Sequence, residues 1–138
     1  MHVVVGQKAT VTSEMVRSFA EMTGDCNPLH FDEEFAARTR FGRLIAQGAV
    51  TTGILNALVA MDMPGPGTVF VKQTWRYPAP VYIGDSIRAE ASVKRVHEGR
   101  PMADMDVVIT NQHGEEVLLG EATVYQAAPT ENPGGAEG

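Results

Sequence analysis

The feature that most constrains the fold of this chain is a long segment without charge. No Asp, Glu, Lys or Arg occurs from Leu44 to Met61. Its apolar residues surround the predicted helix axis instead of forming one stripe, and a helix that is apolar on all sides must be enclosed. The segment is too polar for a membrane span, because it contains Gln47, Gly48, Thr51, Thr52, Gly53 and Asn56. We therefore predict a buried helix from about Gly48 to Met61, ended by the turn residues 62–67.

The second half of the chain predicts strands. Apolar and polar residues alternate with a period of two, which is typical of strands with one buried face. The strand-like runs are 69–77, 87–94, 103–110 and 116–125. Short polar connections that contain glycine, at 97–101 and 111–114, predict hairpins. One antiparallel sheet wrapped around the enclosed helix, an α+β fold, is the simplest architecture.

Length, charge and cysteine content restrict the class of protein. At 138 residues the chain fits one compact domain, predicted over 1–127, followed by a disordered tail over 128–138. A formal net charge of −6 argues against binding to nucleic acid or to a membrane surface. The single cysteine, Cys26, excludes an internal disulfide framework, and the N-terminus lacks the features of a signal peptide. We therefore expect a cytoplasmic protein.

Two short helices are predicted before the enclosed one, after a brief first strand over 3–5. Thr12 or Ser13 can cap the first helix, and Gly24 can end it in a left-handed conformation. Its apolar face is expected to carry Met15, Val16, Phe19 and Met22. The second helix, within 32–42, begins after a capping aspartate and ends at a glycine.

The densest group of chemically active residues lies between these helices, in Thr23-Gly24-Asp25-Cys26-Asn27-Pro28-Leu29-His30. Pro28 opposes helical continuation, so residues 25–30 are expected to form a rigid loop. General acid–base catalysis requires a carboxylate and an imidazole near one reacting atom, as Asp25 and His30 would be. The same residue types are common in ordinary turns, and by their physical chemistry alone a plain helix-exit turn is the more frequent outcome.

A specific signature contains this group. An aromatic residue precedes Ser/Thr-Gly-Asp-x-Asn-Pro-aliphatic-His, and a small residue follows: Phe19, Thr23, Gly24, Asp25, Asn27, Pro28, Leu29, His30 and Ala36. This pattern resembles the signature of the MaoC-like, (R)-specific enoyl-CoA hydratase family. Residues 41–48 are similar to the family's entry into its central helix, and residues 78–85 to its Pro-Val-x-x-Gly-Asp connection. The resemblance covers nearly the whole chain except the tail, and it implies a hot-dog fold, in which an antiparallel sheet wraps around a central helix.

The resemblance also implies a reaction. In such an enzyme, Asp25 and His30 hold a water, activate it for attack on C3 of a trans-2-enoyl thioester and supply a proton to C2. The reverse reaction dehydrates an (R)-3-hydroxyacyl thioester. Gly48 is expected to offer a backbone N–H at the helix N-terminus to the thioester oxygen, where negative charge develops. The expected substrate is an acyl-CoA or another acyl-carrier thioester of fatty acid metabolism, with no cofactor apart from the coenzyme A of the substrate.

Four further residues are candidates for substrate binding. Asn27 is expected mainly to brace the loop, and Gln47 stands where the family commonly has histidine. Thr52 and Asn56 would line an acyl tunnel, and an enclosed amide needs hydrogen-bond partners. Their polarity hints at a short or polar acyl chain. Several basic residues could meet coenzyme A phosphates across a subunit interface or form a solvated face of the sheet: Lys72, Arg76, Arg88 and Lys94.

Two other functions fit the same fold. A hot-dog thioesterase usually has a carboxylate on or near the central helix, and the segment from Leu44 to Met61 contains none. A non-catalytic subunit that binds acyl thioesters would not need both Asp25 and His30. No spacing of His, Cys and Asp predicts a metal site. Because such a sheet leaves an edge strand exposed, we expect at least a homodimer.

Overall fold

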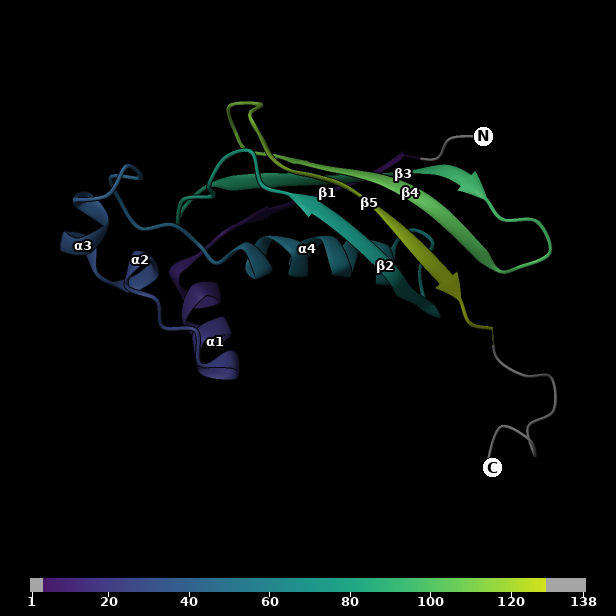
Figure 1. Ribbon diagram of the computed structural model, residues 1–138, viewed down its shortest axis with the longest axis horizontal. Helices are drawn as coiled ribbons and strands as arrows, with labels where there is room; N and C mark the ends of the chain where they lie inside the picture. The colour runs from purple at the N-terminus through teal and green to yellow at the C-terminus, as the bar shows by residue number, and fades with distance from the viewer. Residues whose placement is uncertain (1–3, 129–138) are drawn as a thin grey trace.

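The computed structural model describes residues 4–128, which form an antiparallel sheet with one long helix against it (Figure 1). The strands are β1 (Val4–Thr10), β2 (Thr68–Arg76), β3 (Ser86–Val96), β4 (Met102–Thr110) and β5 (Glu116–Gln126). The helices are α1 (Ser13–Thr23), α2 (Pro28–Phe31), α3 (Glu33–Ala37) and α4 (Gly48–Met61). The five strands lie in the order β1-β3-β4-β5-β2, and α1, α2 and α3 gather on the same side of the sheet as α4. The predicted sheet around a central helix is confirmed.

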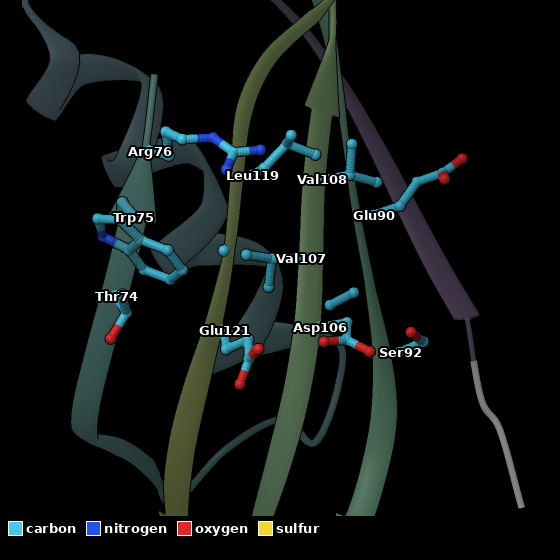
Figure 2. Close-up of a pocket in the computed structure, with 12 residues that line it drawn as sticks. Thr74, Trp75, Arg76, Glu90, Ser92, Asp106, Val107, Val108, Leu119 and Glu121 are labelled. Carbon is cyan, nitrogen blue, oxygen red and sulfur yellow. The ribbon is translucent and has the colours of Figure 1, made fainter. Parts of the chain in front are cut away.

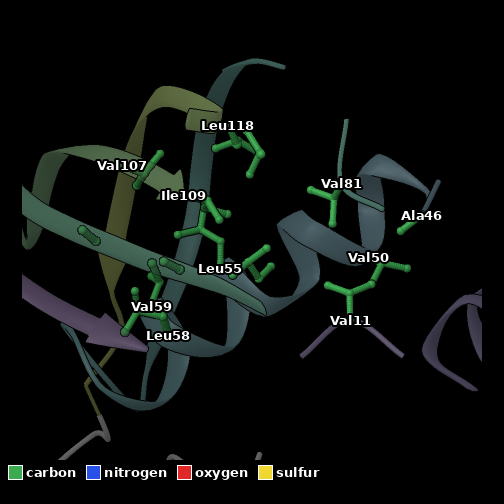
Figure 3. Packing of buried hydrophobic residues seen from close by; sticks show 14 of the residues in the cluster. Val11, Ala46, Val50, Leu55, Leu58, Val59, Val81, Val107, Ile109 and Leu118 are labelled. Atoms are coloured by element: carbon green, nitrogen blue, oxygen red, sulfur yellow. The ribbon is translucent and has the colours of Figure 1, made fainter. Parts of the chain in front are cut away.

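The central helix α4 has the predicted bounds. One side of it packs against the sheet and is fully or nearly fully buried, through Val50, Thr51, Leu55, Leu58 and Val59. Figure 3 shows Leu55 on the side of α4 that faces Ile109 and Leu118 of the sheet, and Val50 beside Val11 and Val81. Burying each large apolar side chain contributes roughly 1.5–3 kcal/mol, so this contact stabilises the fold by several kcal/mol.

The prediction that α4 is enclosed on every side is wrong for a single chain. Its other side is exposed, at Ala49, Gly53, Asn56, Ala57 and Met61. The exposed fraction of Met61 is 68%. A five-stranded sheet and the short helix α1 are too narrow to surround a helix, so part of its apolar surface is left without a covering element.

Helix α1 begins as predicted, because the Thr12 side chain accepts a hydrogen bond from the Met15 backbone N–H at 3.2 Å. It ends at Gly24, whose φ of 85° is left-handed. The buried face differs from the prediction: Val16 and Ala20 are buried, whereas Met22 is 75% exposed. Only a narrow stripe of α1 packs tightly, so Met15 and Met22 keep much of their surface exposed.

The edge strands differ most from the predictions. The first strand is longer than expected and pairs along β3 from Val4 to Thr10. In β2 the regular alternation is interrupted by a bulge between Phe70 and Lys72. As a result Phe70 packs against the core, as does Trp75, while Val71 is 57% exposed. A bulge places an extra residue in one strand and so shifts which side chains face the core.

The inner strands follow the sequence pattern closely. In β3 the residues Ile87, Ala89 and Ala91 are buried, and in β4 the same holds for Met105, Val107 and Ile109. The predicted hairpins connect β3 to β4 and β4 to β5. Apart from Ala128, the tail predicted to be disordered lies outside the described residues. Within the described part of the chain, no helix is long and apolar enough to cross a membrane.

Candidate active site

The predicted acid–base residues lie in the connection between α1 and α3. Asp25 is partly exposed, and its Oδ1 accepts a hydrogen bond from the Asn27 backbone N–H at 3.3 Å. The Thr23 hydroxyl oxygen in turn accepts a hydrogen bond from the Asp25 N–H at 3.2 Å. These local bonds hold the carboxylate next to the left-handed turn at Gly24, which ends α1.

The prediction of a rigid loop over residues 25–30 is only partly correct. The loop ends at Asn27, whose Oδ1 accepts a hydrogen bond from the Leu29 N–H at 3.0 Å and caps the short helix α2. Pro28 is the first residue of α2. Proline is tolerated at this position because the first N–H groups of a helix have no intrahelical acceptor, so no hydrogen bond is lost. Pro28 therefore starts a helical turn, and this turn carries His30.

The His30 imidazole is buried and has a fixed orientation. Its exposed fraction is 8%, and its Nδ1 lies 2.7 Å from the Ile45 carbonyl oxygen. A carbonyl oxygen can only accept, so Nδ1 must carry the proton of this hydrogen bond. In the neutral ring, Nε2 then has a free lone pair and can accept a proton.

An extended strap, residues 44–47, leads from the turn after α3 to the start of α4. The Ile45 N–H donates to the Leu29 carbonyl at 3.2 Å, and the Ala46 N–H donates to the Val81 carbonyl at 2.8 Å. Ile45 also forms a bridge to Tyr82 in the connection between β2 and β3. Since Ile45 also accepts the His30 bond, the strap fixes the imidazole relative to the N-terminus of α4.

Gln47 anchors the start of α4 to α1. Only 3% of it is exposed, and its Nε2 donates to the Val16 carbonyl at 3.1 Å. Its Oε1 is buried without a hydrogen-bond partner among the described residues. The side chain therefore contacts α1, and its predicted role in substrate binding stays a prediction.

Gly48 is the first residue of α4 and lies under an aromatic ring. A Cβ atom at Gly48 would lie 3.1 Å from two atoms of the Tyr77 ring. The N–H groups at a helix start lack intrahelical acceptors, so the first turn of α4 is a potential donor to an anionic oxygen. Burial raises the pKa of Tyr77, and a hydrogen bond with Thr52 offsets part of this effect.

Two cavities flank the first turns of α4. One, of about 410 Å³, is lined by Arg40, Phe41, Ile45, Ala46, Gly48, Thr51, Tyr77, Pro78, Ala79, Pro80 and Val81. The other, of about 550 Å³, lies between α1 and α4 and is lined by Met15, Ser18, Phe19, Met22, Ala49, Val50, Thr52, Gly53 and Asn56. The predicted substrate-binding residues Thr52 and Asn56 thus share one cavity, and Gly48 lines the other.

Comparisons with known proteins identify the family of this chain. The model of the MaoC-like domain matches residues 1–117. The chain belongs to the MaoC-like dehydratase family. It is 43% identical to a 3-hydroxybutyryl-CoA dehydratase of Methylorubrum extorquens, over 85% of this chain and 74% of that protein. It is 36% identical to an (R)-specific enoyl-CoA hydratase of Aeromonas caviae, over 87% of this chain and 92% of that protein.

The fold of this MaoC-like protein also matches a solved relative. It superposes on an (R)-hydratase from A. caviae with a TM-score of 0.86 and 31% identity, over 90% of this chain and 94% of that chain. The predicted hot-dog fold is therefore confirmed.

A larger hollow lies on the open face of the sheet of this MaoC-like protein, away from the α2 turn. Its volume is about 760 Å³, and it crosses β2, β5, β4 and β3 (Figure 2). Two of its charged lining residues pair with basic residues beside the hollow, Glu90 with Arg88 at 2.8 Å and Glu121 with Lys94 at 3.3 Å. These pairs fit a solvated sheet face, and a role of Arg88 or Lys94 in coenzyme A binding stays a prediction.

Sequence reasoning missed two residues near the site. The sequence pattern predicts that Tyr77 is part of a strand, whereas in the structure Tyr77 follows β2 and its ring covers Gly48. Asp85 is 4% exposed, and its carboxylate accepts hydrogen bonds from the Tyr82 N–H and the Gln112 amide, at 2.9 and 3.0 Å. It therefore braces the connection that holds the strap. The Gly-Asp of the family connection was the available signal for Asp85. Among residues 4–128, no three of His, Cys, Asp and Glu form a metal-binding group.

Proposed function

We propose that this MaoC-like protein catalyses the reversible hydration of trans-2-enoyl thioesters to (R)-3-hydroxyacyl thioesters. The observation that carries the proposal is the hydrogen bond between His30 Nδ1 and the Ile45 carbonyl, because it leaves Nε2 available as a base. The Asp25 carboxylate lies in the adjoining turn. Membership of the family and the names of the relatives support the same reaction.

In the proposed mechanism, a water is held between the Asp25 carboxylate and His30 Nε2. The pair removes a proton from this water as its oxygen bonds to C3 of the enoyl group. Electron density moves to the thioester oxygen, where the N–H groups at the start of α4 stabilise the negative charge. The pair then supplies a proton to C2.

The proposed carrier is coenzyme A, because both relatives are named for CoA thioesters. The cytoplasmic location predicted from the sequence stays a prediction. No cofactor takes part in the proposed steps, since proton transfer and oxyanion stabilisation are within the reach of side chains and backbone N–H groups.

The direct test is to incubate the protein with crotonyl-CoA and follow the absorbance of the conjugated enoyl thioester. Thiol release is measured in parallel, and the configuration of the product is determined by chiral chromatography. We expect the enoyl absorbance to fall without thiol release and the (R)-3-hydroxy product to accumulate. Thiol release at the same rate would contradict the proposal and favour a thioesterase. Unchanged absorbance with short, long and branched enoyl-CoA substrates would favour a non-catalytic binding subunit.

Gly48 gives a second test of the mechanism. Gly48→Ala is expected to lower kcat/KM about tenfold, because the new Cβ displaces the Tyr77 ring and shifts the thioester by a fraction of an ångström. The melting temperature should not fall, since alanine has a higher helix propensity than glycine. An unchanged kcat/KM would argue against a substrate at the start of α4, and a parallel loss of stability would point to misfolding.

We also propose that the protein is a homodimer in which a second copy covers the β2 edge. This strand has a free side, since β5 is its neighbour on the other side. Two valines of β2 are exposed, Val69 at 54% and Val71 at 57%. Edge strands with apolar residues are prone to pair with another chain, and soluble proteins usually cover or charge such edges. The exposed side of α4 supports the same proposal.

Sedimentation velocity tests this assembly. The unmodified protein is expected to sediment as a dimer or larger oligomer, and Val71→Lys is expected to shift it toward the monomer, because it places a charge on the edge. The matched control is Val96→Lys, which replaces another exposed valine at the far end of β3. A monomeric unmodified protein, or equal effects of the two variants, would contradict the proposed interface.

A further inference from the structure

Three arginines form the most concentrated positive charge of this acidic chain. Arg38, Arg40 and Arg43 lie between α3 and α4, and the sequence from 35 to 61 contains no acidic residue. The whole chain has a formal net charge of −6, so an anionic substrate is repelled by most of the surface. An arginine of this group that no carboxylate neutralises would offset this repulsion locally, beside the candidate site.

Each of these guanidinium groups stacks on an aromatic ring. Arg40 lies 5.1 Å from the centre of the Phe41 ring, and Arg43 lies 3.8 Å from that of Tyr82. Stacking restricts a long side chain without using its hydrogen-bond donors, which point outward in the plane of the guanidinium. An arginine held in this way is oriented to bind a group that carries several oxygen atoms.

Arg40 differs from its two neighbours in its surroundings. Arg38 pairs with Glu34 at 3.6 Å, and Arg43 lines a separate small cavity together with Glu33. No carboxylate pairs with Arg40 within residues 4–128. Arg40 is also the only charged residue among the described residues that line the 410 Å³ cavity beside Gly48. The cavity therefore combines an apolar wall, a helix start and one cation.

We propose that Arg40 binds an anionic group of the thioester substrate and so selects for negatively charged substrates. This inference rests on the proposed hydratase function. Two parts of a substrate offer the required chemistry, the phosphate of the carrier and a carboxylate at the end of the acyl group. The guanidinium can bind either through two parallel N–H···O hydrogen bonds.

The test compares Arg40→Gln with the unmodified protein on four substrates: crotonyl-CoA, crotonyl-4′-phosphopantetheine, crotonyl-pantetheine and fumaryl-pantetheine. If Arg40 binds the carrier phosphate, Arg40→Gln should raise KM about tenfold for the two phosphorylated substrates and leave crotonyl-pantetheine unchanged. If it binds an acyl carboxylate, only fumaryl-pantetheine should be affected. In both cases Arg40→Gln should nearly retain kcat for the affected substrate, and the salt dependence of its KM should be weaker than in the unmodified protein. Arg40→Lys, which keeps the charge, should restore part of the loss.

The matched control is Arg100→Gln, which removes one positive charge in the β3–β4 hairpin, away from this cavity. The inference would be overturned if Arg40→Gln changed no KM by more than Arg100→Gln does. It would also be overturned if Arg40→Gln lowered kcat/KM equally for all four substrates. The proposed hydratase function would stand, because the unmodified protein would still hydrate crotonyl-CoA. If the unmodified protein hydrated none of the four substrates, the proposed function itself would fail.

Discussion

Replacing Asp25 by Asn is expected to lower the kcat of enoyl-thioester hydration by about 10²–10⁴-fold, the usual contribution of a general acid–base group. The substitution is nearly isosteric. The Asn Oδ1 can still accept the hydrogen bond from the Asn27 N–H, so the turn should keep its shape. The lost charge and basicity, and not a change in fold, should therefore account for the lower rate.

His30→Asn is expected to lower kcat to a similar degree. Its side-chain amide keeps an N–H donor near the Ile45 carbonyl, whereas the lone pair of Nε2 is lost. His30→Ala would remove both, and it would leave the partly buried Ile45 carbonyl without its partner. Far-UV circular dichroism and the melting temperature check that each variant is folded.

The matched control in the same loop is Cys26→Ser, which changes an exposed residue between Asp25 and Asn27. Its kcat should equal that of the unmodified protein. If Asp25→Asn and His30→Asn also kept full activity with crotonyl-CoA, the assignment of the acid–base pair would be wrong. If Cys26→Ser lost activity to the same extent, the effect of the other two variants would have to be attributed to the conformation of the loop.

The sequence predicts well those parts of the fold whose structure follows from the pattern of apolar and turn residues within one segment. The bounds of α4 follow from an uncharged segment between a glycine and a Pro-Gly turn. The alternation in β3 and β4 follows from strands that have one side on the core, as Ala89 and Ile109 show. The sequence does not predict that His30 lies in a helical turn, because proline opposes the continuation of a helix and also suits the first position of a new one.

Other features depend on contacts between distant segments. Tyr77 covers Gly48 because the connection after β2 crosses the start of α4, and no local pattern encodes that crossing. The bulge in β2 depends on pairing with β5 and changes which side chains face the core. The exposure of Met22 and Met61 is also a tertiary property, since it depends on how much of each helix one sheet can cover.

The largest structural effect is expected at Gly120 in β5, which sequence reasoning did not single out. A Cβ atom there would overlap the Thr74 carbonyl oxygen and the Trp75 ring of β2. The carbonyl belongs to the sheet ladder between Trp75 and Gly120 and cannot move without breaking the pairing. Gly120→Ala is therefore expected to lower the free energy of unfolding by about 1–3 kcal/mol or more, as overpacking of a core does.

The measurement is urea unfolding followed by circular dichroism, with Gly6→Ala as the matched control in another strand of the same sheet. The three atoms nearest to a Cβ at Gly6 all belong to the guanidinium of Arg88, the closest at 3.1 Å, and this flexible, half-exposed side chain can shift together with its partner Glu90. Gly6→Ala should therefore leave the midpoint unchanged or raise it, because alanine restricts the unfolded chain more than glycine does. Equal midpoints for the two variants would mean that β2 can shift away from β5 freely. Because β2 leads directly into Tyr77, such freedom would also remove the reason to expect a fixed cavity beside Gly48.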